Sequence, residues 1–227
     1  MTVKSTLFDR IREALRVPRR ASHPLREHAQ VEVKDFREWL PHPGENPESW
    51  RKLFREKSIE LKIEFIEVPD HAGLASTVVD LAKKNGWKKI AIHGDSVLSE
   101  ITQPLGLPIV RTEAPYAIPD LENCDAGITT CEALIAQTGS VLVTSKGQQG
   151  RAVTILPPHH VVIATHDQLL PDLSAAFSLM KQKYSSSYPS MISFITGPSR
   201  TGDIERILVL GAHGPRFLTV ILIAGTG

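Results

Sequence analysis

The stretch KKIAIHGDSVLSEITQPLGLPIVR, residues 88–111, predicts the fold class of this chain. It opens with an apolar strand over 88–93, continues as a short helix that begins near Asp95 and ends by Gln103, and closes with a strand over 108–111. Strands that are apolar on both faces and alternate with helices are typical of a parallel sheet covered by helices. The stretch therefore predicts an α/β protein.

The segments before this stretch continue the same alternation. A helix is predicted over 47–60, and KIEFIEV at 62–68 has the alternating pattern of a strand. A second helix is predicted from His71 to Asn85, with Gly86 as its stop signal. Together with residues 88–111 these segments read as βαβαβ, which favours a mainly parallel sheet.

The segments after the stretch depart from strict alternation. The elements predicted there are a helix over 129–137, strands over 140–144, 152–156 and 160–165, a long helix from Asp167 to about Tyr184, and a strand over 191–196. The last two apolar runs, RILVLG at 206–211 and FLTVILI at 217–223, read as a strand pair or a bent strand. We expect all of them to belong to one α/β domain.

The N-terminal part has a different composition. Residues 5–16 place apolar side chains at helical spacing after a Ser or Thr cap, and residues 17–47 carry five prolines among scattered charges. The excess of basic residues in the first 30 fits either docking to an acidic partner or a solvated helix with a mobile tail. We expect a helix and extended arm over 1–46 and an α/β domain over 47–227.

The overall composition excludes several classes of protein. The chain has 227 residues, a formal net charge of +1 and 41% hydrophobic residues, so it has no overall field that favours nucleic acid or an anionic membrane. No apolar run approaches a membrane span and no signal-peptide core is visible, which predicts a cytoplasmic protein. Cys124 and Cys131 fit neither a disulfide framework nor a metal ligand set.

The turn FITGPSRTGDIE at 194–205 is the first candidate for chemistry. A strand that runs into the N-terminus of a short helix would leave free backbone N–H groups for a phosphate or carboxylate, and an arginine could clamp that anion. The equally weighted alternative is that Arg200 pairs with Asp203 or Glu205 and that the glycines serve only the turn. The candidate ligand-binding residues are Gly197, Pro198, Ser199, Arg200, Thr201 and Asp203.

Two further turns are candidates for lining one binding pocket together with the turn at 194–205. GAHGP at 211–215 holds His213 beside Gly214, and an imidazole there could act as acid, base or ligand. QTGSVLVTS at 137–145 contributes Gly139 and Ser140, although it is first of all a connection between elements. HGDSVLSE at 93–100 resembles a nucleophile elbow only superficially, so its Asp95 or Ser96 is interpreted as a helix cap. The acid–base candidates are Asp203, Glu205, His213 and Glu132.

Four ordered motifs resemble a known family. TGSVLV at 138–143, LPPHHVVI at 156–163, GPSRTGDIE at 197–205 and LVLGAHGP at 208–215 are similar to the LUD domain family, in its stand-alone lactate utilization protein C branch. The resemblance covers about residues 60–223. It implies a three-layer α/β/α sandwich on a mainly parallel sheet, similar to the superfamily of sugar-phosphate isomerases and CoA transferases.

The resemblance also implies a biological setting. The family belongs to bacterial oxidation of L-lactate to pyruvate, in which lactate utilization proteins A and B carry iron–sulfur clusters. This chain has two cysteines, so we expect no cofactor in it, clusters only in the partner subunits, and a role as a subunit that binds a small anionic ligand. The alternatives are a free-standing isomerase or acyl/CoA-transfer enzyme that uses Asp203, Glu205 or Glu132, and a purely structural or regulatory subunit.

Two positions depart from the family pattern. Gln137 stands where a glutamate is common, which replaces a possible carboxylate base with a neutral amide. Gly202 stands where alanine is usual, which would loosen a helix start by up to about 1 kcal/mol.

Overall fold

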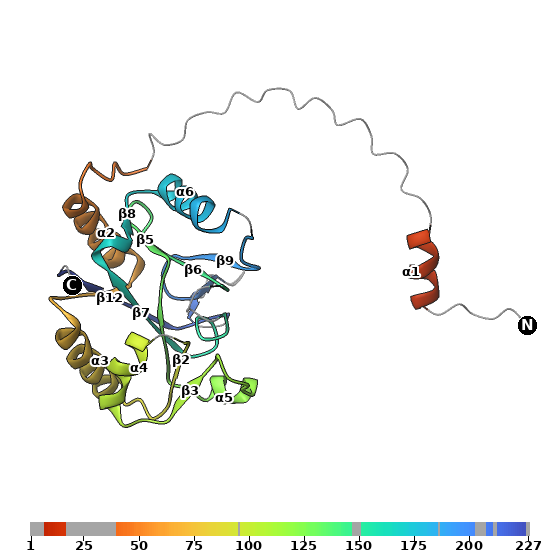
Figure 1. The fold of residues 1–227 in the computed structure, drawn as a ribbon, viewed down its shortest axis with the longest axis horizontal. Helices are drawn as coiled ribbons and strands as arrows, with labels where there is room; N and C mark the ends of the chain where they lie inside the picture. The colour runs from red at the N-terminus through yellow and green to blue at the C-terminus, as the bar shows by residue number, and fades with distance from the viewer. Residues whose placement is uncertain are drawn as a thin grey trace, which may run out of the picture. The chain divides into compact units, whose positions relative to one another are not determined.

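The computed structural model describes residues 7–16, 40–94, 96–146, 151–185, 187–202, 208–210 and 213–225 (Figure 1). The chain divides into two compact units, residues 1–39 and 40–227. In the first unit the predicted amphipathic helix forms as α1 (Leu7–Arg16), where Arg12 pairs with Asp9 at 3.3 Å. Residues 17–39 of the predicted arm lie outside the described residues.

The second unit is built on a six-stranded sheet in which every described pairing is parallel. The confirmed fold class is therefore α/β with a mainly parallel sheet. The sheet order is β1-β12-β7-β4-β2-β3, and the longest strands, β7 and β12, are neighbours inside it. The strands are β1 (Glu64–Val68), β2 (Ile90–Ile92), β3 (Ile109–Arg111), β4 (Ala126–Thr130), β7 (His159–Thr165) and β12 (Phe217–Ile223).

Two helices and a 3-10 turn cover one face of this sheet: α3 (His71–Asn85), α4 (Ser96–Thr102) and η2 (Gln103–Leu105). The ends of α3 are set locally, because Asp70 accepts a 2.8 Å hydrogen bond from the Gly73 N–H and Gly86 adopts φ 65° after the last turn. Leu74, Val78, Leu98 and Ile101 are buried against Ile90, Ile92, Ile128 and Ile221.

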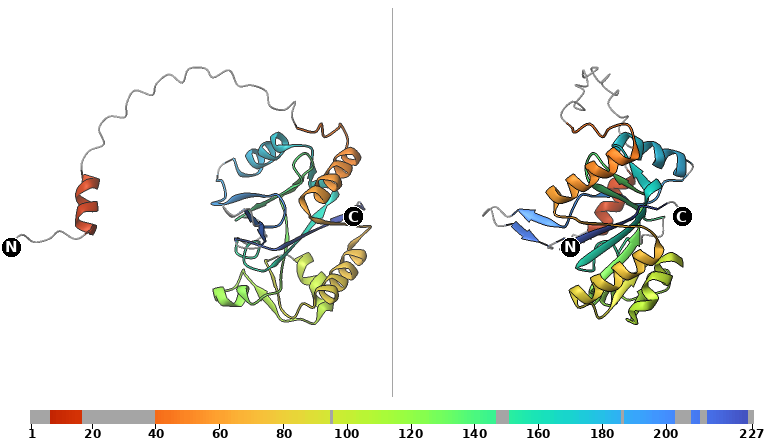
Figure 2. Two further views of the ribbon diagram at one scale, coloured as in Figure 1. Left: turned by 180° about the vertical axis from the view of Figure 1, so that it is seen from behind. Right: turned by 90° about the vertical axis from the view of Figure 1, so that its left-hand side faces the viewer.

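The opposite face is covered by α2 (Pro47–Leu61) and by a second sheet of four strands in the order β8-β5-β6-β9. Asn46 caps α2 by accepting a 2.9 Å hydrogen bond from the Ser49 N–H, and Phe54 is fully buried in the core beneath it. Helix α6 (Leu173–Tyr184) packs on the outer side of the second sheet (Figure 2). Its strands are β5 (Ala133–Ile135), β6 (Ser140–Thr144), β8 (Leu169–Leu170) and β9 (Ile192–Ile195).

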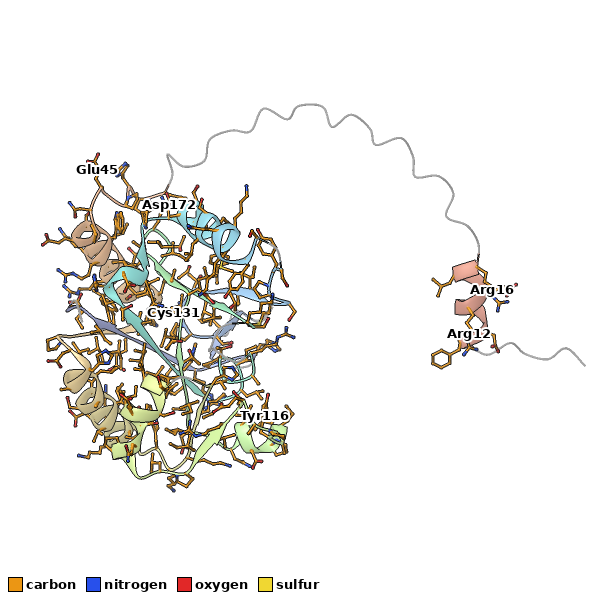
Figure 3. The ribbon with its side chains drawn as sticks, in the orientation of Figure 1. Arg12, Arg16, Glu45, Tyr116, Cys131 and Asp172 are labelled. Atoms are coloured by element: carbon orange, nitrogen blue, oxygen red, sulfur yellow. The ribbon has the colours of Figure 1, made fainter. Side chains whose placement is uncertain are left out.

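The predicted helix over 129–137 is wrong, because this segment contains the end of β4 and all of β5. Residues 131–136 are buried in the second sheet. Cys131, Leu134 and Ala136 pack towards the six-stranded sheet and Ala133 and Ile135 pack towards α6, so apolar side chains face both neighbouring layers. Cys131, labelled in Figure 3, lies in this interior.

Two other predictions in this half are corrected. Residues 152–156, predicted as a strand, form consecutive turns closed by the 2.9 Å bond from the Leu156 N–H to the Ala152 carbonyl. They pack with α5 (Ile118–Glu122) over β2 and β3, where Val153 is fully buried. The long helix predicted from Asp167 begins only at Leu173, because Asp172 caps it and η3 (His166–Gln168) and β8 come first.

The C-terminal region also differs from expectation. Strand β10 (Arg200–Gly202) pairs antiparallel with β11 (Leu208–Leu210), so the helix expected after Gly197 does not form at 200–202. The last two apolar runs are not a strand pair, because β11 joins β10 while β12 lies between β1 and β7. Within the described ranges, no helix has the length and apolar character needed to cross a membrane.

Candidate functional site

An opening in the sheet's layers lies where β2 and β3 end. The chain leaves β2 towards α4 on one face and leaves β3 towards α5 on the other, since Ile90 and Ile92 pack with α4 while Ala91 and Val110 pack with Leu121 of α5. In open α/β sheets, such a divergence at the carboxyl ends of neighbouring strands is where ligands bind. The topology therefore favours a site above β2 and β3.

A cavity of about 400 Å³ lies at this point. Its polar lining comes from residues that directly follow strands and from the loop after β6, and its apolar lining comes mainly from the turns over 152–156. Tyr116, labelled in Figure 3, belongs to the segment that leads from β3 to α5. The lining residues are His93, Thr112, Tyr116, Ser145, Arg151, Ala152, Ile155 and Leu156.

His93 is held in place by the neighbouring strand end. Its Nδ1 lies 2.6 Å from Thr112 Oγ1, and Thr112 Oγ1 donates to the Ile92 carbonyl at 3.4 Å. If Nδ1–H of a neutral His93 donates to Thr112, Nε2 carries the lone pair. Among the described residues Nε2 has no hydrogen-bond partner, so in this tautomer it can accept one from a ligand. Gly94, which follows, donates its N–H to Glu113 at 3.0 Å.

Arg151 supplies the positive charge of the cavity. One guanidinium nitrogen donates to Ser190 Oγ at 2.8 Å, and Ser145 Oγ lies 3.0 Å from the same hydroxyl. Within the described part of the chain Arg151 has no carboxylate partner. Nearby Lys146 is engaged, because it donates to Ser187 Oγ at 2.6 Å. Arg151 is thus the guanidinium that can pair with a carboxylate or phosphate in the cavity.

The turn singled out from the sequence is packed against the C-terminal end of α2. The Arg200 guanidinium donates a hydrogen bond to the Leu61 carbonyl, which is one of the terminal carbonyls of that helix. Gly197 adopts φ 97°, and a Cβ there would lie 3.1 Å from the same carbonyl oxygen. Within the described residues, Arg200 therefore caps a helix end.

The structure does bring the predicted turns together. Ser140 Oγ lies 2.7 Å from Thr196 Oγ1, next to Gly197, and Gly139 packs against Lys57 and Leu61 of α2. The Ser199 N–H donates to the Pro215 carbonyl at 2.8 Å, and a Cβ on Gly214 would lie 3.4 Å from Ser199 Cβ.

The remaining candidates from these turns lie as follows. His213 is exposed and Pro198 is half-buried. Thr201 is part of strand β10. Asp203 and Glu205 lie outside the described residues. None of the predicted ligand-binding residues that the structure describes lines the 400 Å³ cavity, and whether these turns bind a ligand stays a prediction.

Glu132 lies at the link between β4 and β5 and is almost fully buried. Its carboxylate accepts hydrogen bonds from Lys183 at 2.6 Å, Tyr184 at 2.7 Å and Thr144 at 2.9 Å. Burial acts to raise the pKa of Glu132, but these three hydrogen bonds and the charge of Lys183 outweigh it and hold the pKa below its ordinary value. A carboxylate stabilised in its charged form in this way is a weak base.

Sequence reasoning missed the lining of the cavity. His93 lay in a segment interpreted only as a helix cap. The available signal was the polar residue that follows each of two neighbouring strands, His93 after β2 and Thr112 after β3. Ser145 also follows a strand, β6, but that strand belongs to the second sheet, and no such signal marks Arg151. Among the described residues, no group of three or more His, Cys, Asp or Glu side chains could hold a metal ion.

The chain is similar in sequence to several proteins named lactate utilization protein C. The chain is 26% identical to lactate utilization protein C of Bacillus velezensis, over 98% of this chain and 96% of the relative, and 27% identical to that of Bacillus subtilis, over 82% and 86%. It is 30% identical to the protein YkgG of Escherichia coli over 66% of this chain and 68% of the relative.

A solved structure shares the fold. The crystal structure of a DUF162 family protein from Deinococcus radiodurans matches with a TM-score of 0.61 and 18% identity, over 79% of this chain and 99% of the other. The sequence pattern of the LUD domain matches residues 51–223, which include all six strands of the parallel sheet. This chain therefore belongs to the LUD domain family.

Proposed function

We propose that this protein takes part in bacterial L-lactate utilization and binds the small 2-hydroxy carboxylate in the cavity above β2 and β3. One observation carries the ligand assignment: a guanidinium without a carboxylate partner among the described residues, Arg151, shares a cavity with an imidazole, His93, whose Nε2 is available. The similarity to proteins named lactate utilization protein C, which extends over nearly the whole chain, supports the biological setting.

The two groups match the two polar ends of lactate. A carboxylate is the natural partner of a guanidinium, which can donate two parallel hydrogen bonds to it. The hydroxyl on the neighbouring carbon can donate to Nε2 of His93, which Thr112 holds in orientation. Because pyruvate has an oxo group that only accepts, it lacks this second hydrogen bond and binds more weakly.

The proposal assigns this chain a binding role beside redox partners. Lactate utilization proteins A and B are the proposed partners, with the iron–sulfur clusters in those subunits, and the assembly is placed in the cytoplasm. This division of labour follows from the cysteines, because a cluster is commonly held by four thiolates and this chain has two cysteines, both buried and free.

The proposal is tested by isothermal titration of the full-length protein with L-lactate and pyruvate. Arg151→Gln should raise the Kd for lactate by about 10- to 100-fold, the range for losing a charge-assisted hydrogen bond. Arg55→Gln is the matched control, because Arg55 is an exposed arginine on α2 that pairs with Glu67. Arg200→Ala tests the turn at 194–205, the candidate anion site predicted from the sequence. Lactate binding that survives in Arg151→Gln and disappears in Arg200→Ala would move the site to that turn.

The cellular role has its own test. A strain that lacks the gene should fail to grow on L-lactate, and a wild-type copy should restore growth whereas an Arg151→Gln copy should not. Normal growth of the deletion strain on lactate would contradict the proposed setting, whatever the titration shows.

A further inference from the structure

We infer that the cavity above β2 and β3 is shaped for a 2-hydroxy acid with an apolar side chain larger than the methyl group of lactate, and that an aromatic side chain fits it best. This inference rests on the proposed function, since it uses the same carboxylate and hydroxyl contacts. It concerns the remainder of the cavity, which those contacts leave unfilled.

The first argument is size. The cavity has a volume of about 400 Å³. Lactate takes up roughly the space of three or four water molecules, which is about 100 Å³ at about 30 Å³ per water. A ligand of this size would leave most of the cavity to solvent. The volume lies instead within the range that encloses a ligand of a dozen or more heavy atoms.

The second argument is the chemistry of the remaining wall. The apolar part of the lining is formed by Tyr116, Ala152, Ile155 and Leu156. Tyr116 is 37% exposed and Ile155 is 43% exposed, so large apolar groups face solvent at the cavity. An apolar ligand group would cover this surface, and a flat ring could pack against the ring of Tyr116.

The third argument is the order of the groups along the wall. Arg151, which is assigned to the carboxylate, precedes Ala152 directly, and the turns over 152–156 follow. The charged end of the wall is therefore continuous with its apolar part. A 2-hydroxy acid has the same arrangement, because its carboxylate and its side chain are attached to one carbon atom.

The test is a titration of the full-length protein with three 2-hydroxy acids that share one head group and with one acid that lacks the hydroxyl. L-Lactate, L-2-hydroxyisocaproate and L-phenyllactate differ only in the side chain, and 3-phenylpropionate keeps the ring and carboxylate but lacks the hydroxyl. We expect the Kd to fall at each step from lactate to phenyllactate, by at least about tenfold in total. Loss of the hydroxyl should reverse most of that gain.

Variants of the apolar wall locate the effect. Ile155→Ala and Tyr116→Ala should each remove most of the preference for phenyllactate over lactate. Tyr116→Phe keeps the ring and should keep the preference. Ile59→Ala is the matched control, because Ile59 is 74% exposed on α2, away from the cavity lining. Thermal unfolding of each variant confirms that it folds.

The outcomes separate this inference from the proposed function. Equal affinity for lactate and phenyllactate would overturn the inference and leave the proposed function standing, whereas no binding of any of these acids would overturn both. If 3-phenylpropionate binds as tightly as phenyllactate, the hydroxyl is not recognised and the assigned ligand class is wrong. A preference for phenyllactate that persists in both Ile155→Ala and Tyr116→Ala would also contradict the inference.

Discussion

Lys183 donates a 2.6 Å hydrogen bond to the buried carboxylate of Glu132 and thereby joins the last turn of α6 to the link between the two sheets. The two residues are 51 positions apart in the sequence. The Glu132 side chain is almost fully enclosed, whereas the Lys183 side chain is 53% exposed. Charge is therefore brought into the interior by the glutamate and compensated from the surface by the lysine.

Lys183→Met should lower the free energy of unfolding by about 3 kcal/mol, because it leaves a buried carboxylate without its charged partner. Glu132→Gln should cost less, since the lysine it leaves behind can be hydrated. Chemical denaturation of both single variants and the double variant measures the coupling. If the two single effects simply add, the pair does not interact in the folded state.

Acid should destabilise the protein from about pH 6.5 downward through two buried histidines. Burial lowers the pKa of His159 to about 4, and burial lowers the pKa of His160 to about 3. The ordinary value in the unfolded chain is about 6.5. Below pH 6.5 the unfolded chain therefore binds protons that the native chain does not. As the pH is lowered from 6.5, the free energy of unfolding should decrease until these native pKa values are reached. The decrease is up to about 2.7 kcal/mol per pH unit, because two protons are involved.

Burial keeps these rings neutral, because protonation would place an Nδ1–H in the interior where no described residue accepts it. Thr219 donates to Glu64 at 3.0 Å, so it accepts from Nε2–H of His159 at 2.8 Å. The Nδ1 atoms of His159 and His160 are buried and have no partner among the described residues. Urea denaturation between pH 7 and pH 4 measures the slope, and His160→Gln should reduce it by about 1.4 kcal/mol per pH unit. An unchanged slope in that variant would refute the assignment.

Arg200→Ala should cost about 1 kcal/mol of stability, because it removes the donor to the Leu61 carbonyl at the end of α2. The loss should appear as a lower denaturation midpoint with an unchanged dependence on denaturant concentration. Under the proposed function, the Kd for lactate should not change. Arg216→Ala is a suitable control, since the side chain of this exposed arginine makes no hydrogen bond or ion pair with any described residue.

Gly127→Ala should be far more damaging than Gly86→Ala. A Cβ on Gly127 would lie 2.4 Å from the Val153 carbonyl oxygen, which backbone movement alone could relieve, so we expect a loss of about 3 kcal/mol or more. Nothing lies within 4 Å of a Cβ on Gly86, whose φ of 65° should cost only about 1 kcal/mol. Similar denaturation midpoints for the two variants would show that the turns over 152–156 shift easily away from β4.

Both thiols should be unreactive in the folded protein. Cys124 and Cys131 are buried, and burial raises the pKa of Cys124 to about 11 and raises that of Cys131 as well. The thiolate is the reactive form, so a disulfide reagent at pH 8 should modify neither residue until denaturant is added. Rapid reaction of one thiol under native conditions would show that the surrounding layer opens readily.

The sequence by itself determined the elements whose signals are local. Residues 47–111 carry their own caps, stops and apolar spacing, such as Asp70 and Gly86 around α3, and the predicted elements there agree with the structure to within a few residues. These signals act between residues a few positions apart, which is why they can be recognised without the tertiary structure. The α/β class followed from their order.

Only the tertiary structure decided the second sheet and the cavity. Residues 133–136 are apolar at every position because layers cover them on both sides, and a short apolar run of this kind does not distinguish a helix from buried strands. Ser145 and Arg151 reach the cavity from a distant part of the chain, whereas His93 and Thr112 line it because β2 and β3 are parallel strands that end at one edge of the sheet. Their order in that sheet is fixed by crossovers and packing between distant segments, so no local spacing in the sequence records it.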